Sequence, residues 1–311
     1  GVDRESFYGK AQDKDVFNAH AVTSRLKWEA NDTWTVYNDT RFSYYDRDFS
    51  TSVPGCAYTT GDPPAPACAS FFFAGQPAFL SSFGGGNPTY EQKSWGAQNI
   101  TSGVAKFETG SLRHEAVVGL DFFYQSNERD YFTVTGKDPS LVDVRNPGAT
   151  FRLPYTVTRN PNNDRSGHAT NVALFGSDRI WLTDQFSVLA GGRWDYNSAV
   201  YDRPLGTGAP PNPARVENDT DFFSPKVSLI WEPKKSQTYY VSWAQSFTPA
   251  GQFVTNASDG INPNSPDLEP ETSDLYEIGG KWDLLDGRLG LTAALFQIDK
   301  SNAYYSDPVT G

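Results

Sequence analysis

The sequence has no methionine, and its 311 residues include only two cysteines and three histidines. Because translation starts with methionine, we expect that the chain, which begins at Gly1, is a mature form or a fragment. A structural zinc ion needs about four ligands. The histidines are scattered along the chain, so no metal site is predicted; they are His20, His114 and His168.

A long hydrophobic run is also missing. A transmembrane helix needs about 20 consecutive, mostly apolar residues, and no stretch approaches that length, so no such helix is predicted. The strands of a membrane β-barrel alternate between apolar and polar residues and escape this criterion. The net charge of −11 argues against a nucleic-acid partner, because phosphate backbones attract basic surfaces.

The sequence lacks the short motifs that mark common catalytic sites. There is no Gly-x-Ser-x-Gly elbow, no His-Glu-x-x-His pattern, no phosphate-binding glycine loop and no Cys-x-x-Cys pair. We therefore expect that the protein is not an enzyme and that it holds no cofactor.

Aromatic residues are plentiful instead, at 14% of the chain, together with 27 glycines and 21 prolines. This composition is typical of strands and turns. Alternation of apolar and polar residues places successive side chains on opposite faces of a strand, and it predicts about ten strands here. Their approximate ranges are 17–29, 33–49, 94–109, 112–134, 167–182, 186–202, 220–232, 237–248, 272–284 and 288–304.

The predicted connections alternate strictly between short and long. The short ones are rich in Gly, Asn and Asp, which suit tight hairpins; they are 30–32, 110–111, 183–185, 233–236 and 285–287. The long ones are 50–93, 135–166, 203–219 and 249–271. Short periplasmic turns and long extracellular loops are typical of an up-and-down transmembrane barrel.

Several aromatic residues flank the short turns, where an aromatic girdle would lie at the membrane–water interface. They are Trp28, Trp34, Trp181, Phe186, Trp231, Tyr239 and Trp282. The alternative is that these residues fill the core of a soluble β-sandwich. The regular sorting of loop lengths favours an all-β fold for residues 1–311, an antiparallel up-and-down transmembrane β-barrel.

The two cysteines, Cys56 and Cys68, lie in one loop that is rich in Pro, Gly and Ala. Because no histidine is near them, we favour a disulfide over a zinc site. A disulfide implies an oxidising compartment, such as the periplasm or the cell surface.

Two segments resemble a known family. The stretch 267–273, Asp-Leu-Glu-Pro-Glu-Thr-Ser, is followed by Glu-Ile-Gly-Gly-Lys-Trp at 277–282, a tight turn, and Ala-Ala-Leu-Phe-Gln-Ile at 293–298. This pattern resembles the barrel signature of TonB-dependent receptors, and its matching residues are Leu268, Pro270, Glu271, Glu277, Gly279 and Lys281. The stretch 1–9 is similar to a segment of siderophore receptors, particularly of the catecholate-type branch.

The resemblance implies a barrel of about 22 strands, filled by an N-terminal plug. This chain would hold about ten of the strands, without the plug and the C-terminal strands. The resemblance further implies a bacterial outer-membrane importer of a ferric siderophore, in which iron travels only within the ligand. Its partners would be the TonB complex, through the missing N-terminal region, and lipopolysaccharide. Alternatives are import of cobalamin or an oligosaccharide, a passive porin, and a soluble secreted sandwich that binds carbohydrate.

One long loop, 135–166, holds more cations than anions in a chain that is acidic overall. Arginine suits the flat, anionic rings of a ferric tris-catecholate through charge and stacking. We expect Arg145, Arg152, Tyr155 and Arg159 to contribute to ligand capture. The alternative is a solvated loop, or arginines that pair with lipopolysaccharide phosphates.

Overall fold

The protein is described here by a computed structural model, which covers residues 2–6, 8–10, 13–53, 55–56, 71–81, 88–135, 141–147, 156–203, 215–249 and 269–303. Ten long strands form one antiparallel sheet, in which each strand pairs with the next long strand along the chain. They are β1 (Lys14–Glu29), β2 (Trp34–Ser50), β5 (Thr89–Thr109), β6 (Leu112–Thr135), β9 (Arg165–Trp181), β10 (Phe186–Asp202), β11 (Arg215–Lys234), β12 (Gln237–Thr248), β13 (Glu271–Leu284) and β14 (Leu289–Ser301).

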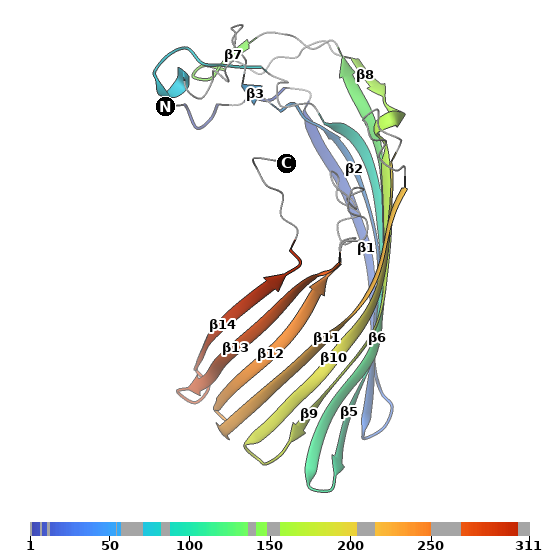
Figure 1. The fold of residues 1–311 in the computed structure, drawn as a ribbon, viewed down its shortest axis with the longest axis vertical. Helices are drawn as coiled ribbons and strands as arrows, with labels where there is room; N and C mark the ends of the chain where they lie inside the picture. The colour runs from blue at the N-terminus through green and yellow to red at the C-terminus, as the bar shows by residue number, and fades with distance from the viewer. Residues whose placement is uncertain are drawn as a thin grey trace.

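All ten predicted strands are present, and their up-and-down order is confirmed. The largest differences from the predicted ranges are extensions of β5 and β11 toward the long loops. The sheet bends into an open arc with the short turns at one end (Figure 1). Among the described residues, no helix is long and apolar enough to cross a membrane.

Short strands in the long loops were not predicted, because each is too short to show alternation. They are β3 (Gly55–Cys56), β4 (Phe79–Ser81), β7 (Leu141–Asp143) and β8 (Thr156–Arg159), with one 3-10 turn, η1 (Pro161–Asn163). β4 pairs with both β3 and β7, so two different long loops share one small sheet. This sheet lies at the long-loop end of the arc (Figure 1).

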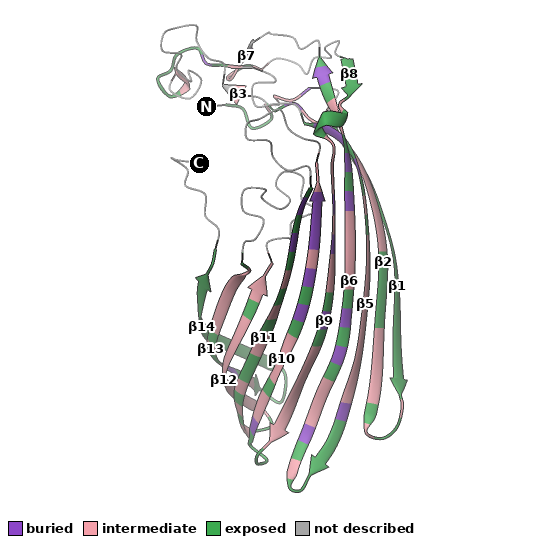
Figure 2. Ribbon diagram, turned by 45° about the vertical axis from the view of Figure 1, so that its right-hand side comes forward, coloured by how far each residue is buried: buried purple, intermediate pink, exposed green. Residues whose placement is uncertain are grey.

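The sheet has two chemically different faces, which we call the outer and the inner face. One lateral row of the outer face contains Leu229, Val241, Ile278 and Leu295, and their exposed fractions run from 49% to 77%. Most of the buried polar residues of β6 and β10 point the other way, to the inner face. Buried residues of both strands are purple in Figure 2. A soluble sandwich would cover its apolar face, whereas lipid covers that of a membrane barrel.

Aromatic rings form a continuous band on the outer face beside the short turns. The ring centres of Phe186 and Trp231 are 6.0 Å apart, those of Trp231 and Tyr239 5.3 Å, and those of Tyr239 and Trp282 5.8 Å. A second band near the long loops joins Trp95 to a neighbouring ring on each side, Phe42 and Tyr124, at 6.2 and 4.6 Å. Two such bands mark the interfaces of a membrane barrel.

Trp181 departs from the predicted girdle. It pairs with the buried Ser187 on the inner face. There the guanidinium carbons of Arg113 and Arg179 each lie 4.4 Å from its ring centre. A sequence position near a turn does not reveal the face, because a shift of one residue reverses it.

The Glu-x-Gly pattern of β13 has a packing explanation. Tyr240 of β12 pairs directly with Gly279, and its hydroxyl donates a hydrogen bond to the Glu277 carboxylate. A Cβ atom added to Gly279 would lie only 2.5 Å from the Tyr240 Oη and 2.6 Å from its Cζ. The glycine therefore provides the space in which the tyrosine lies flat and reaches the carboxylate.

Gly279→Ala should destabilise the sheet, because the tyrosine ring must move and lose its carboxylate partner. Overpacking of this kind costs about 1–3 kcal/mol. The matched control is Gly290→Ala on β14, where the added Cβ would meet nothing closer than 3.9 Å. Thermal unfolding of the full-length protein in detergent, followed by circular dichroism, should show a lower Tm for Gly279→Ala alone. Equal melting of the two variants would refute this explanation.

Candidate functional site

A row of cationic and amide side chains crosses the inner face near the long loops. Arg47 pairs with Gln92, Gln92 pairs with Arg129, and Arg129 pairs with Arg165. Arg203 follows the end of β10 directly. In an antiparallel sheet, side chains of directly paired residues lie on the same face. Four consecutive strands, β2, β5, β6 and β9, thus present one lateral row, which we call the arginine row.

Tyrosines border the arginine row. Tyr90 and Tyr131 pair with each other in the adjacent row toward the loops, and their ring centres are 5.6 Å apart. The guanidinium carbon of Arg129 lies 4.7 Å from the centre of the Tyr90 ring, and that of Arg165 lies 5.6 Å from the Tyr131 ring. Arg47 donates a hydrogen bond to the Tyr90 hydroxyl at 3.1 Å. Arg129 and Arg165 therefore stack against aromatic rings.

Arg129 is the most unusual member of the arginine row. Only 6% of the residue is exposed, and its Nε and Nη1 atoms are buried without a hydrogen-bond partner among the described residues. Two guanidinium nitrogens of Arg203 are in the same state. Both residues line a hollow of about 410 Å³ together with Arg165. Buried guanidinium donors without acceptors are costly, so this hollow suits an anion that can accept hydrogen bonds.

Carboxylates also line this hollow, and most of them already have a cation. Asp164 accepts two hydrogen bonds from Arg159, one of 2.6 Å, and Asp130 accepts another at 2.7 Å. Asp202 lies 3.4 Å from Arg215. These carboxylates therefore do not satisfy the buried Nε and Nη1 atoms of Arg129, which have no hydrogen-bond partner among the described residues.

Electrostatics differ along the arginine row. Asp15 accepts two hydrogen bonds from Arg47, at 2.6 and 2.7 Å, so this arginine is neutralised. The hydrogen bond from Arg47 lowers the pKa of the Asp15 carboxyl below its usual value. Burial raises the pKa of the Tyr90 hydroxyl, and the positive charges of Arg129 and Arg47 oppose that rise. The charge that remains for an anion is therefore concentrated toward Arg129.

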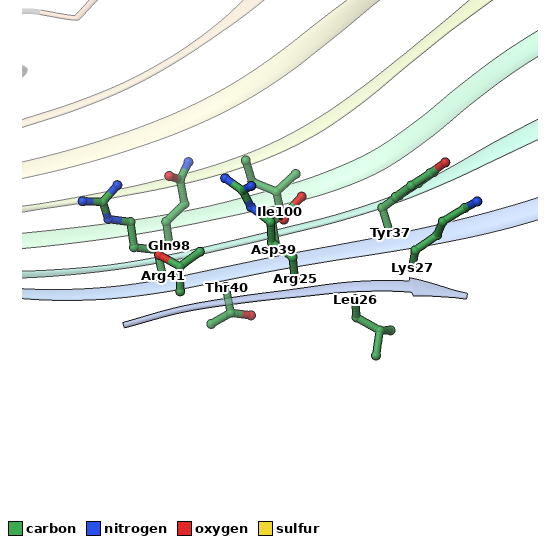
Figure 3. Close-up of a pocket in the computed structure, with 10 residues that line it drawn as sticks. Arg25, Leu26, Lys27, Tyr37, Asp39, Thr40, Arg41, Gln98 and Ile100 are labelled. Atoms are coloured by element: carbon green, nitrogen blue, oxygen red, sulfur yellow. Dashed lines mark ion pairs between the residues drawn. The ribbon is translucent and has the colours of Figure 1, made fainter. Parts of the chain in front are cut away.

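A second hollow of about 570 Å³ lies on β1, β2 and β5. Figure 3 shows Tyr37, Arg41 and Gln98 pointing to the inner side, whereas Leu26 and Thr40 point away from it. Its cations are more exposed than those of the arginine row; the Arg25 side chain is 82% exposed and 3.6 Å from a carboxylate oxygen. Solvent screens such a pair strongly, so this hollow is the weaker candidate.

Two predicted ligand residues can be placed. The guanidinium of Arg145 donates hydrogen bonds to the carbonyl oxygens of Gln76 and Phe72, at 2.7 and 2.8 Å, so it ties two loops together. Arg159 donates to Asp164, Asp130 and the Tyr131 carbonyl. Arg152 and Tyr155 lie outside the described residues. The role of these four residues in ligand capture stays a prediction.

The other predicted residues are the two cysteines and the family motif. Cys68 lies outside the described residues, so the pairing with Cys56 stays a prediction. Leu268 also lies outside them, and Pro270 stands directly before β13. Glu271 forms an ion pair with Lys300 of β14. Lys281 pairs in register with Thr238 of β12.

Sequence reasoning missed the arginine row because its members come from separate hairpins. The tight turn at Gly110 sets the register of β5 and β6, so the pairing of Gln92 with Arg129 could have been counted from it. The pairing of Arg129 with Arg165 spans a long loop. No local signal in the sequence sets that register.

Comparison with known proteins places the chain in one family. The family model described as TonB dependent receptor-like, beta-barrel, matches residues 1–311. BfrD of Bordetella pertussis, a probable TonB-dependent receptor, is 30% identical over 219 residues, which cover 66% of this chain and 29% of BfrD. The catecholate siderophore receptor Fiu of Escherichia coli K12 is 26% identical over 324 aligned residues, which cover 97% of this chain and 40% of Fiu.

Solved structures share the fold. The ferric-catecholate import receptor Fiu in its closed form matches with a TM-score of 0.76 and 23% identity, over 96% of this chain and 43% of Fiu. The siderophore receptor PiuA of Acinetobacter baumannii matches with a TM-score of 0.76 and 21% identity, over 95% of this chain and 42% of PiuA. The chain thus spans less than half the length of these relatives.

The clamp between Arg159 and Asp164 should be sensitive to acid. The hydrogen bond from Arg159 lowers the pKa of the Asp164 carboxyl, so the clamp stabilises β8 at neutral pH. This contribution is lost only as the pH falls through the lowered folded pKa, below the ordinary value of about 3.9. Pepsin cleavage around β8 in the full-length protein should begin only below that value.

The matched variants are Asp164→Ala and Asp130→Ala. Asp164→Ala removes two hydrogen bonds to Arg159 and one to the Tyr131 amide, so cleavage should start well above the ordinary carboxyl pKa. Asp130→Ala removes a single bond and should have a smaller effect. Cleavage of the unchanged protein near pH 4 would contradict the assignment.

Proposed function

We propose that this chain, which belongs to the family of TonB-dependent receptor β-barrels, is wall of a bacterial outer-membrane receptor that imports a ferric siderophore. The observation that carries the proposal is the arginine row, with the buried guanidinium of Arg129 at its centre; two nitrogens of that group have no hydrogen-bond partner among the described residues. The matching relatives include receptors described by the words siderophore and catecholate. Iron enters as cargo held by the siderophore and is not a cofactor of the protein.

A ferric tris-catecholate is a flat-ringed anion, and the arginine row matches both properties. Guanidinium groups balance its negative charge and donate in-plane hydrogen bonds to its oxygens. The Tyr90 and Tyr131 rings beside them offer aromatic surface for stacking. Because the row lies on the inner face at the long-loop end, a ligand entering from outside would reach it early. Binding and import leave the covalent bonds of the siderophore unchanged, so no enzymatic activity is proposed.

The proposed partners follow from the same placement. Energy for import would come from the TonB complex, through a part of the full protein outside this chain. Lipid and lipopolysaccharide would contact the outer face, where apolar side chains are exposed between two aromatic bands. A passive porin needs no concentrated anion site, and a neutral oligosaccharide carries no negative charge to balance the buried guanidinium groups.

Arg129→Gln in the full-length protein should weaken binding of a ferric tris-catecholate by about 10- to 100-fold, because a charged hydrogen bond contributes about 1.5–3 kcal/mol. Quenching of tryptophan fluorescence in detergent measures the affinity. The matched control is Arg113→Gln, since Arg113 lies on the same strand and face but at the opposite end, against Trp181. Equal affinities of Arg129→Gln and the unchanged protein would refute this site.

The loop residues need a separate test. Arg145→Ala, Arg152→Ala, Tyr155→Ala and Arg159→Ala should each weaken ferric-catecholate binding if the loop captures ligand. Because Arg145 holds two backbone carbonyls, its variant should be checked for intact loop packing by protease resistance. Unchanged affinity in all four variants would leave the arginine row as the ligand site and reject the loop.

A further inference from the structure

The outer face carries a polar patch halfway along β2 and β5. In the same lateral row on the neighbouring strands β6 and β9, the outward residues are apolar and exposed, as at Leu120 and Leu174. On β2 and β5 the corresponding residues are two asparagines and two threonines. They are Asn38, Thr40, Asn99 and Thr101, which we call the Asn/Thr ring.

The four side chains form a closed cycle of hydrogen bonds. Asn38 donates to the Thr101 hydroxyl at 2.8 Å, and that hydroxyl donates to the Asn99 carbonyl oxygen at 3.1 Å. Asn99 donates to the Thr40 hydroxyl at 2.7 Å, which donates back to the Asn38 carbonyl oxygen at 3.1 Å. Each of the four groups both donates and accepts, so the cycle holds itself together without solvent.

The Asn/Thr ring lies midway between the two aromatic bands. On β5, Asn99 and Thr101 fall between Trp95 of the upper band and Phe107 near the short turn. Figure 3 shows Thr40 pointing with Leu26 away from the inner hollow. A span of about 9–11 residues crosses the hydrocarbon layer, so the ring faces the bilayer centre. This placement rests on the membrane location in the proposed function.

Hydrogen-bonding capacity remains after the ring has closed. An asparagine side chain has two N–H donors and two carbonyl lone pairs, and the ring uses one of each. Within the part of the chain that the structure describes, the second N–H groups of Asn38 and Asn99 have no acceptor. Lipid tails offer none, and unsatisfied polar groups in hydrocarbon are unfavourable.

The unused groups are one N–H donor and one carbonyl lone pair on each asparagine. Two copies of the patch can therefore form hydrogen bonds with each other. A two-fold axis through such a patch lets each copy satisfy the other. Ser24 of β1, which pairs with Thr40, adds a small residue at its edge, and small residues allow close approach in membranes. We propose that the Asn/Thr ring is the contact through which two copies of the full-length protein associate side by side in the outer membrane.

Cysteine cross-linking in native outer membranes tests this proposal. Ser24→Cys should give a cross-linked dimer under mild oxidation, because the two copies of residue 24 would lie close to the two-fold axis. The matched control is Leu229→Cys, which is also exposed on the outer face but lies on β11. It should give at least tenfold less dimer. The unchanged protein reports any background from its own cysteines.

Combining Ser24→Cys with Asn38→Leu and Asn99→Leu should reduce the cross-linked dimer at least tenfold. Heat-modifiable migration on gels confirms that this variant is folded. If it does not fold, a second variant combines Ser24→Cys with Leu26→Trp. The added tryptophan should block close approach of the two copies while the Asn/Thr ring stays intact, so the cross-linked dimer should again be lost. Equal cross-linking at residues 24 and 229, or a dimer that survives these changes, overturns the proposal. Siderophore affinity plays no part in this readout, so failure of the importer proposal would be seen separately.

Discussion

Within a bilayer, backbone N–H and C=O groups that lack a partner are unfavourable, and a sheet meets this demand only by pairing strand to strand without interruption. The ten long strands do this through nine consecutive antiparallel pairings. Once the ladder is continuous, the register of every hairpin is set, and with it the face on which each side chain lies. The outer apolar rows, the aromatic bands and the inner polar network all follow from that one requirement.

The same ladder assembles sites from residues that are far apart in the sequence. Arg47 and Arg165 belong to one lateral row although more than a hundred positions separate them. No loop has to fold in a special way to build this row. Its geometry is that of the sheet, so it is present before a ligand arrives, and little ordering of side chains is needed on binding. A site carried by the long loops would lack this advantage.

The sequence alone predicted the ten strands, their order and the sorting of the connections, because alternation and turn chemistry are local signals. It did not predict which face Trp181 occupies, since that depends on a register that shifts by single residues. The arginine row stayed hidden for a related reason: the pairing of β6 with β9 crosses a long loop that has no recognisable turn. The Glu-x-Gly pattern was recognised as a resemblance, but its cause, the ring of Tyr240 over Gly279, became visible only in the structure.

The position of Trp181 has a practical consequence. Trp231 and Trp282 belong to the outer band, which faces lipid. Trp181 lies on the opposite face, with two guanidinium carbons 4.4 Å from its ring centre. The natural tryptophans therefore form two groups that can be distinguished by fluorescence quenching, one on the outer face and one on the inner face of the sheet. A quencher attached to acyl chains darkens one population, and a water-soluble quencher that enters the lumen darkens the other. The fluorescence of the outer tryptophans thus reports on the surrounding membrane, and the fluorescence of Trp181 reports on what occupies the interior of the barrel.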